Sequence, residues 1–473
     1  MPDTIKTDIC VIGAGSGGLT VAAGASQMGA DTVLIERGRM GGDCLNYGCV
    51  PSKAMLAAAH AAHAARHGGA FGVSASDVSV DFGRVNDHIH EVIAAIAPND
   101  SVERFEGLGV RVIRADARFT GDRTLQAGDV TVSARRVVIA TGSSPMTPPI
   151  PGLDQVAYFT NETIFDNRTL PEHLLVIGGG PIGLELAQAH RRLGARVTVL
   201  EAAQALGKDD PDLAAVVLAR LREEGVVIHD KVKIERVNGG EGIKITLSGD
   251  GVPESVEGSH LLVATGRKAN VDGLDLEKAG VNYSPKGIAV DDRLRTSNHK
   301  IFAIGDVTGG YQFTHMASYH AGIAIRNALF RLPSKVSHRA VPWVTYTDPE
   351  LAQVGLTEAG ARQRHSDIQV LRWTFEENDR AHAERAGEGV CKVMVTRRGE
   401  ILGATLVGRH AGELLQPWIV AVSQKLKIGA LANIIAPYPT LAEVNKRAAG
   451  SYYTPKLFND TVRKVVRLLA KLG

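Results

Sequence analysis

The chain has 473 residues, of which 44% are hydrophobic and 22% are charged, and its formal net charge at pH 7 is +2. A chain of this length is too long for one ordinary hydrophobic core, so we expect several domains. The near-neutral charge argues against a dominant electrostatic partner such as nucleic acid, and no apolar run approaches the roughly 20 residues that a membrane-spanning helix needs.

Glycine and cysteine are the informative residue types. The 52 glycines exceed the usual share of about 7%, and glycine lets backbone approach phosphate groups closely. Four cysteines are too few for a disulfide scaffold, and the N-terminal residues run directly into an apolar strand without a signal-peptide pattern. We therefore expect a cytoplasmic protein that binds nucleotides.

The first predicted element is a strand over 5–12, which leads directly into Gly13-Ala-Gly15-Ser-Gly-Gly18. A helix is predicted over 19–28, and a second strand over 32–35 ends at Glu36. The glycines allow a tight turn that brings a pyrophosphate to the helix N-terminus, and the acid accepts hydrogen bonds from a ribose. The candidate ligands of this first dinucleotide are Gly13, Gly15, Gly18 and Glu36.

Two cysteines follow this acid within the segment Gly41-Gly-Asp-Cys44-Leu-Asn-Tyr-Gly-Cys49-Val-Pro-Ser-Lys53. Pro51 is typical of a helix start, so Cys49 is predicted to lie beside a helix N-terminus, where the dipole lowers the pKa of a thiol. Lys53 is predicted one turn further along that helix, and Cys44 is near enough to close a disulfide.

Three kinds of site compete for this cysteine pair. A structural disulfide is disfavoured in the cytosol. A zinc site needs two more ligands, and neither Cys10 nor Cys391 offers suitable spacing. Both of these cysteines lie in apolar strands and are interpreted as small buried hydrophobic residues. We therefore favour dithiol–disulfide redox chemistry.

The strand–glycine–helix–strand–acid arrangement then recurs. A predicted strand over 174–177 leads into Gly178-Gly-Gly180-Pro-Ile-Gly183, and a strand over 197–200 ends at Glu201. The first glycine and the acid are 23 residues apart in both copies (13 to 36 and 178 to 201). Two complete copies imply two dinucleotides, most simply FAD and a nicotinamide cofactor. The candidate ligands of the second are Gly178, Gly180, Gly183 and Glu201.

Glu201 also bears on the nicotinamide cofactor. A carboxylate suits a free ribose 2′-OH and repels a 2′-phosphate, and the first cation after it is Lys208 rather than a nearby arginine. We expect NADH to be preferred, with NADPH possible.

Each nucleotide unit is predicted to close with a further strand, and a Gly-Asp strand follows later. The closing segments are 137–142 and 261–266, both ending in Ala-Thr-Gly, and 301–306 ends in Gly-Asp, whose acid can bind a ribityl chain or form a turn. The further cofactor-binding candidates are Gly42, Thr141, Gly142, Gly266, Arg267, Gly305, Asp306 and His315, the last of these being equally suited to packing.

The cysteine segment, the two glycine motifs and Ala303-Ile-Gly-Asp306 resemble the flavin disulfide reductases, and the similarity covers essentially the whole chain. The resemblance implies an α/β fold with two Rossmann-type domains and a C-terminal α+β dimerisation domain, in a homodimer whose active site is completed across the interface. The corresponding boundaries are 1–150 for the FAD domain, 151–270 for the NAD(P) domain, 271–337 for a return to the FAD domain and 338–473 for the dimerisation domain.

The resemblance also implies roles for single residues. Cys49 would be the thiolate against the flavin, and Cys44 would exchange with the substrate. Lys53 would pair with Glu185 on the helix after the second glycine loop, beside the flavin ring.

The chain departs from the disulfide-reducing members near its C-terminus. Those members carry histidine in an H-P-x-x-x-E segment, where the glutamate orients an imidazole that moves protons. This chain reads Ala436-Pro-Tyr438-Pro-Thr-Leu-Ala-Glu443, so the acid is present and tyrosine replaces histidine. With a phenol pKa of about 10, Tyr438 is a poor base at neutral pH. It donates a hydrogen bond, contacts a metal-bound ligand or packs in the dimer interface.

Tyrosine at this position resembles the mercuric reductase members, whose product needs no proton. The vicinal C-terminal cysteine pair of those enzymes is missing, because no cysteine follows Cys391. We expect electrons to pass from NAD(P)H through FAD and the cysteine pair to a soft metal ion or another electrophile. The alternatives are a dihydrolipoyl dehydrogenase-like disulfide reductase and a slow redox-sensing or scaffolding flavoprotein.

Two further features are noted. His60, His63 and His67 share helical spacing but are more typical of a solvated or interface-lining face than of a metal site. The last predicted helix, 459–472, is basic and amphipathic, and it either packs on the dimer or contacts an anionic membrane surface.

Overall fold

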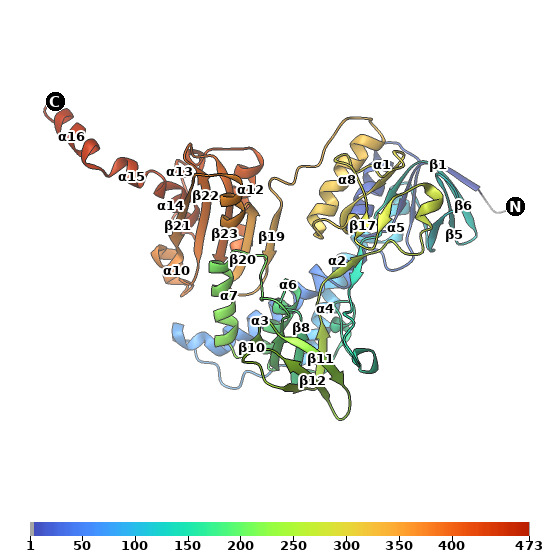
Figure 1. Ribbon diagram of the computed structural model, residues 1–473, viewed down its shortest axis with the longest axis horizontal. Coiled ribbons are helices and arrows are strands. Elements are labelled where there is room, and N and C mark those ends of the chain that lie inside the picture. Colours follow the sequence, from blue (N-terminus) through green and yellow to red (C-terminus); the bar gives the residue numbers. More distant parts are fainter. Residues whose placement is uncertain (1–3, 473) are drawn as a thin grey trace. The chain divides into compact units, whose positions relative to one another are not determined.

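A computed structural model describes residues 4–472 of the chain. It divides into two compact units, which are Met1–Ala202 with Ile228–Val336, and Ala203–Val227 with Ser337–Gly473 (Figure 1). Among the described residues, every helix is too short or too polar to cross a membrane.

The first unit contains a seven-stranded sheet built on the first glycine motif. Strand β1 pairs in parallel with β2 and β6, and β18 pairs with β6. In sheet order the strands are β3 (Val110–Ile113), β2 (Thr32–Ile35), β1 (Thr4–Ile12), β6 (Val130–Ile139), β5 (Thr124–Ala127) and β4 (Ala117–Phe119), with β18 (Ile301–Ala303) beside β6. Residues 9–12 of β1 are all buried, as expected of a parallel strand that is covered on both faces.

A second parallel sheet in the same unit repeats this plan. Its strand order is β10 (Val226–His229), β9 (Arg196–Leu200), β8 (His173–Ile177) and β14 (His260–Val263). The first sheet has the same local order, β3-β2-β1-β6, so two Rossmann-type sheets are confirmed. The smaller sheets pair β11 (Lys233–Asn238), β12 (Ile243–Ser248) and β13 (Ser255–Gly258), then β7 (Ser143–Pro145) with β15 (Arg267–Ala269), and β16 (Tyr283–Ser284) with β17 (Gly287–Ile288).

Helices cover these sheets and carry the predicted site residues. The α1 and α6 helices each follow a glycine loop, and α8 packs beside α1. The helices of this unit are α1 (Ser16–Gln27), α2 (Gly42–Asn46), α3 (Cys49–His67), α4 (Phe82–Ile96), α5 (Val102–Gly107), α6 (Pro181–Leu193) and α8 (Thr314–Ala328). The α3 helix begins two residues before Pro51, because a proline costs no hydrogen bond anywhere in the first turn.

The second unit is an antiparallel sheet packed against helices, which confirms the expected α+β domain. The strand order is β19 (Pro342–Thr345), β20 (Glu350–Gly355), β23 (Ile401–Gly408), β22 (Val390–Thr396) and β21 (Ile368–Thr374). Its core contains Phe375 and Trp418, both fully buried. The helices are α7 (Pro211–Glu223), α9 (Glu358–Arg364), α10 (Asp379–Ala383), α11 (Ala411–Leu414), α12 (Gln416–Ser423), α13 (Gly429–Ala432), α14 (Glu443–Ser451), α15 (Thr454–Leu457) and α16 (Asp460–Leu469).

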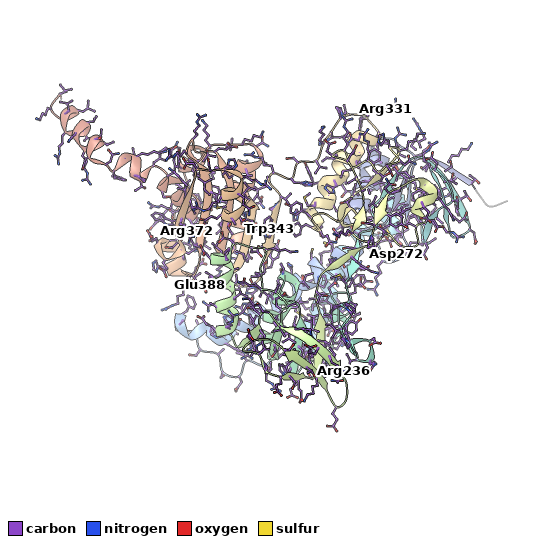
Figure 2. All side chains as sticks on the ribbon, viewed as in Figure 1. Arg236, Asp272, Arg331, Trp343, Arg372 and Glu388 are labelled. Atoms are coloured by element: carbon purple, nitrogen blue, oxygen red, sulfur yellow. The ribbon has the colours of Figure 1, made fainter. Side chains whose placement is uncertain are left out.

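Helix α7 belongs to this second unit although it lies between β9 and β10 in sequence. Three side chains labelled in Figure 2 hold it and its preceding turn. Trp343 donates to Asp209 at 2.7 Å, Arg372 to Asp212 at 2.5 Å, and Glu388 accepts from Arg220 Nε at 2.9 Å. Beneath them the ammonium of Lys392, itself buried, contacts Asp210 at 2.7 Å and Glu358 at 2.6 Å, so that buried charges are paired.

Candidate functional site

The first glycine loop has the backbone geometry of a pyrophosphate cradle. Gly13 adopts a left-handed φ of 103°, and a Cβ there would collide with the carbonyl oxygen of Ala140. A Cβ at Gly18 would likewise collide with the carbonyl oxygen of Gly13. A Cβ at Gly15, in contrast, would meet nothing within 4 Å in the described chain. The loop is therefore closed behind and open in front, where a diphosphate would lie.

The second loop repeats this geometry. Gly178 has a φ of 114°, and its Cβ would collide with the carbonyl oxygen of Ala264. Gly183 is blocked by the carbonyl oxygen of Gly178, whereas Gly180 faces open space among the described residues. Among residues 4–472, no side chain caps the first turn of α1 or α6, so both helix N-termini keep N–H groups for an anion.

The two acids predicted to bind ribose occupy matching positions. Glu36 Oε2 accepts from the backbone N of Ala14 at 2.6 Å, and Glu201 Oε2 accepts from the backbone N of Gly179 at 2.7 Å. Each carboxylate thus lies at the mouth of its glycine loop, where a ribose joins the pyrophosphate. The loops, helix ends and acids together fit two dinucleotides.

The cysteine pair lies beside the first loop. Backbone N of Gly41 donates to the carbonyl of Ala14 at 2.9 Å, and a Cβ at Gly42 would come within 2.7 Å of Gly15 Cα. Cys44 lies in α2 and is half-buried, whereas Cys49 is the first residue of α3 and is exposed. Close packing of glycine on glycine thus brings the thiols to the predicted flavin site.

The two thiols differ in acidity. A hydrogen bond from Cys44, followed by one from Thr314 at 3.4 Å and by the charge of Lys53, lowers the pKa of Cys49 to about 6. The same hydrogen bond and burial raise the pKa of the Cys44 thiol. At neutral pH Cys49 is therefore the thiolate and Cys44 the thiol.

Lys53 and Glu185 meet as predicted. Lys53 Nζ lies 2.8 Å from Glu185 Oε2, which joins α3 to α6. Glu185 is buried, so an unpaired carboxylate there would be costly. The pair connects the cysteine helix with the helix that follows the second glycine loop.

A polar network lines the region between the predicted closing strands. Arg267 Nη2 lies 3.0 Å from Asp43 Oδ1, and its Nε donates to Ser143 Oγ at 2.7 Å. Ser143 in turn donates to Asp306 at 2.7 Å, and burial raises the pKa of that carboxyl. Gly305 and Asp306 lie in a short turn after β18, with the Gly305 backbone N donating to His320 at 3.2 Å.

Thr141 and His315, which were also predicted as cofactor ligands, contact other residues of the chain. Thr141 donates to the carbonyl of Asn270 at 2.7 Å, which ties the two chain segments together. Gly142 and Gly266 both have left-handed φ, at 71° and 126°. His315 is exposed and stacks on Phe313, with ring centroids 5.1 Å apart.

Tyr438 and Glu443 lie in the second unit. The Tyr438 phenol is 69% exposed and donates to Asp379 Oδ2 at 2.8 Å. Asp379, and more weakly Glu443, raise the pKa of Tyr438, so the phenol keeps its proton at neutral pH. The acid that holds this side chain is therefore Asp379, which the sequence reasoning missed.

Sequence reasoning also missed Thr314, Asp43 and Ser143. Thr314 lies 265 residues from Cys49, and no local pattern marks it as a thiolate partner. Asp43 lies within the cysteine segment, directly before Cys44, and this position was the one signal for it in the sequence.

The other two cysteines and two of the helix histidines lie outside the predicted site. Cys10 and Cys391 are fully buried, and burial raises the pKa of both thiols. His63 and His67 stack at 4.0 Å, and in residues 4–472 no group of three or more His, Cys, Asp or Glu side chains is arranged to hold a metal.

Known proteins with similar sequences belong to one enzyme family. Residues 7–321 match the family described as pyridine nucleotide-disulphide oxidoreductase, and residues 341–449 match its dimerisation domain. The mercuric reductase of Streptomyces lividans is 37% identical over 454 residues, covering 94% of this chain and 96% of the relative. A dihydrolipoyl dehydrogenase of Bacillus subtilis (strain 168) is 32% identical over 444 residues, covering 92% and 96%.

Solved structures of the same kind are similar. The Cu(II) complex of the HOCl-induced flavoprotein disulfide reductase RclA from Escherichia coli has a TM-score of 0.83 at 28% identity, covering 93% of this chain and 98% of that chain. LpdA from Mycobacterium tuberculosis has a TM-score of 0.86 at 27% identity, covering 94% and 99%. The chain therefore belongs to the pyridine nucleotide-disulphide oxidoreductase family and is an enzyme of the flavin disulfide reductase type.

Proposed function

We propose that this enzyme passes electrons from NAD(P)H through FAD and the Cys44–Cys49 pair to a soft metal ion, with thiol-bound Hg(II) as the leading acceptor. The observation that carries the choice of acceptor is the hydrogen bond from Tyr438 to Asp379. Because that bond raises the phenol pKa, the residue at the histidine position is a poor proton shuttle.

The chemistry of the acceptor explains why this matters. Reduction of a disulfide substrate releases two thiolates that must be protonated. Reduction of Hg(II) by two thiolates instead breaks both mercury–sulfur bonds, forms the Cys44–Cys49 disulfide and releases neutral Hg(0). With Cu(II), two metal ions would each take one electron, again without a proton.

The chain's own residues have defined tasks in this scheme. FAD, when bound, supplies the two-electron relay between the nicotinamide and the cysteine pair. Cys49 is held as a thiolate by the N-terminus of α3, Thr314 and Lys53, and Cys44 donates the hydrogen bond that stabilises it. Glu185 holds the Lys53 ammonium in place.

Relatives support both soft-metal reduction and an alternative. A mercuric reductase is 37% identical, and the similar RclA structure is a Cu(II) complex. Dihydrolipoyl dehydrogenases match almost as much of the chain, which favours disulfide reduction as the second candidate. A slow redox-sensing or scaffolding flavoprotein is the third and would not show multiple turnovers.

The electron donor, the oligomeric state, the location and the domain boundaries are part of the same proposal. We propose NADH as the preferred donor from Glu201, a homodimer formed by the dimerisation domain, a cytoplasmic location and the four-part division at residues 150, 270 and 337. We further propose that the other residues predicted as cofactor ligands bind the two cofactors.

The decisive experiment measures anaerobic NADH oxidation with Hg(II) in excess small thiol, with lipoamide and Cu(II) in parallel assays. We expect turnover with a metal and little with lipoamide. Rapid lipoamide turnover would show that Tyr438 does not disable proton transfer and would return the enzyme to disulfide reduction.

Cys49→Ser and Cys44→Ser test the relay itself. Each is expected to lower metal-dependent turnover by about 100-fold or more, while flavin stays bound. Cys10→Ala is the control, because that thiol is fully buried within β1 and has no part in the proposed relay, and it should keep full turnover. Full metal turnover in Cys49→Ser would reject the relay.

A further inference from the structure

The C-terminal segment 456–472 has an apolar surface that its own domain leaves uncovered. Helix α16 begins with a formed cap, in which the Asn459 side chain accepts from the backbone N of Val462 at 3.1 Å. In Figure 1 this helix extends from α15 away from the sheet of the second unit. The exposed large apolar side chains of the segment are Leu457, Phe458, Val465, Val466, Leu468, Leu469 and Leu472.

Most of the apolar side chains of α16 form one face of the helix. Val462, Val465, Val466 and Leu469 follow the i, i+3, i+4, i+7 spacing of a single apolar stripe, which Leu472 continues. Leu469 is 58% exposed and Leu472 77% exposed. Among the described residues, the hydrophobic core of the unit extends no further along the chain than Tyr453, so nothing of this core covers the stripe.

The opposite face is basic. Arg463, Lys464, Arg467 and Lys471 lie on it, against a single acid, Asp460. Within residues 4–472, Arg463 is the member of this set that pairs with a carboxylate, at 3.6 Å to Asp460, and both side chains are well exposed. The helix therefore presents cations that the fold does not neutralise.

We propose that α16 is an interfacial anchor that lies on an anionic lipid surface. An apolar face buried among acyl chains, with flanking cations at the phosphate level, uses both faces of the helix. Packing against a second copy of the chain would explain the apolar stripe but would leave the basic face without a role. The region that matches the family's dimerisation domain also ends at residue 449, before this segment begins.

The test uses the full FAD-loaded protein and sedimentation with vesicles. An equal mixture of phosphatidylcholine and phosphatidylglycerol is compared with pure phosphatidylcholine, at low and at high salt. We expect binding to the anionic vesicles that weakens with salt and is at least about 10-fold weaker on the neutral ones. Equal binding to both vesicles, or binding to neither, would overturn the proposal.

Two variants separate the faces of the helix. Replacing Arg463, Lys464, Arg467 and Lys471 together with Gln should lower vesicle binding by about 100-fold or more. Val466→Ser with Leu469→Ser should abolish it at any salt concentration, because the apolar face is lost. Unchanged binding in either variant would contradict the anchor.

A matched control removes four exposed cations elsewhere. Arg111, Lys286, Lys300 and Arg331 are exposed in the first unit, and Arg331 is labelled in Figure 2. Their replacement with Gln makes the same change in net charge and should leave vesicle binding within about 2-fold, since the cations of α16 are untouched. Loss of binding in this control would show a general charge effect and reject the assignment to α16.

The molar mass of each variant without vesicles distinguishes the rival occupant. We expect Val466→Ser with Leu469→Ser to keep the oligomeric state of the parent protein. A fall in oligomeric state would identify the stripe as an interface between copies and overturn the membrane assignment. NADH oxidation should be unchanged in both α16 variants, which confirms that they remain folded.

Discussion

The two dinucleotide units share one backbone plan but differ in what lies against their glycine loops. Both have the same strand order, the same collisions behind the first and third glycines, and an acid bonded to the residue after the first glycine. At the first glycine loop, Gly41 and Gly42 of the cysteine segment pack directly on the loop. The second loop has instead a helix that carries Glu185 to the cysteine helix.

This difference gives a physical reason for two kinds of cofactor behaviour. A loop that is covered by a neighbouring segment favours a cofactor that stays bound, whereas a loop with less cover favours one that exchanges. We infer that the first glycine loop retains FAD and that the second glycine loop exchanges the nicotinamide. The covering segment, rather than the loop itself, distinguishes the two glycine loops.

The largest expected effect comes from Gly18→Ala compared with Gly183→Ala. Each new Cβ would collide with a carbonyl oxygen of its own loop, so overpacking should destabilise each unit by about 1–3 kcal/mol. We expect Gly18→Ala to lose flavin on gel filtration. Gly183→Ala should keep its flavin, while the KM for NADH rises about 10-fold or more. Flavin loss from Gly183→Ala alone would reverse the assignment of the two cofactors to the two glycine loops.

The next effect concerns the two acids. Glu201→Ala removes a charged acceptor at the second loop and should raise the KM for NADH about 10-fold, with a weaker preference over NADPH. Glu36→Ala is the matched change in the first loop and should weaken flavin retention while leaving the KM for NADH unchanged. Steady-state kinetics with both nucleotides and flavin absorbance measure the two outcomes. A strong NADPH preference in the parent enzyme would refute the argument from Glu201.

A smaller effect tests the link between α3 and α6. The alkylation rate of Cys49 in the reduced enzyme should rise with pH around a midpoint of about 6, because the thiolate reacts. Lys53→Gln removes a charge that stabilises this thiolate, so the midpoint should move to higher pH. Glu185→Gln removes the negative charge beside Lys53, and the midpoint should move in the opposite direction. Shifts of the same sign would show that the pair does not act on Cys49 through charge.

The smallest expected effect concerns the second unit. Asp379→Asn removes the carboxylate that raises the Tyr438 pKa, so that pKa should fall towards its usual range. Metal-dependent turnover should change by less than about 3-fold near neutral pH, because the phenol remains protonated in both proteins. Tyr438→Phe serves as the comparison. If Asp379→Asn instead shifted the pH profile of turnover, the phenol of Tyr438 would have a part in proton transfer.

Much of the candidate site was predictable because its parts are local in sequence. The glycine loops, their acids and the position of Cys49 at a helix start each depend on residues within about one strand–turn–helix unit. The pairing of Lys53 with Glu185 spans 132 residues and came from the family resemblance rather than from spacing. Thr314 and Asp379 were not predicted, because each meets its partner only after distant strands and helices have packed.

The sequence by itself determined the two nucleotide folds, the spacing of the cysteine pair and the amphipathic character of the last helix, because each depends on short-range periodicity and turn chemistry. Tertiary structure decided which side chains surround them. It set the acidity of Cys49 through Thr314 and Lys53, gave Tyr438 an acid other than Glu443, and placed α7 with the second unit through Lys392. These contacts depend on packing between remote segments, and no local pattern encodes such packing.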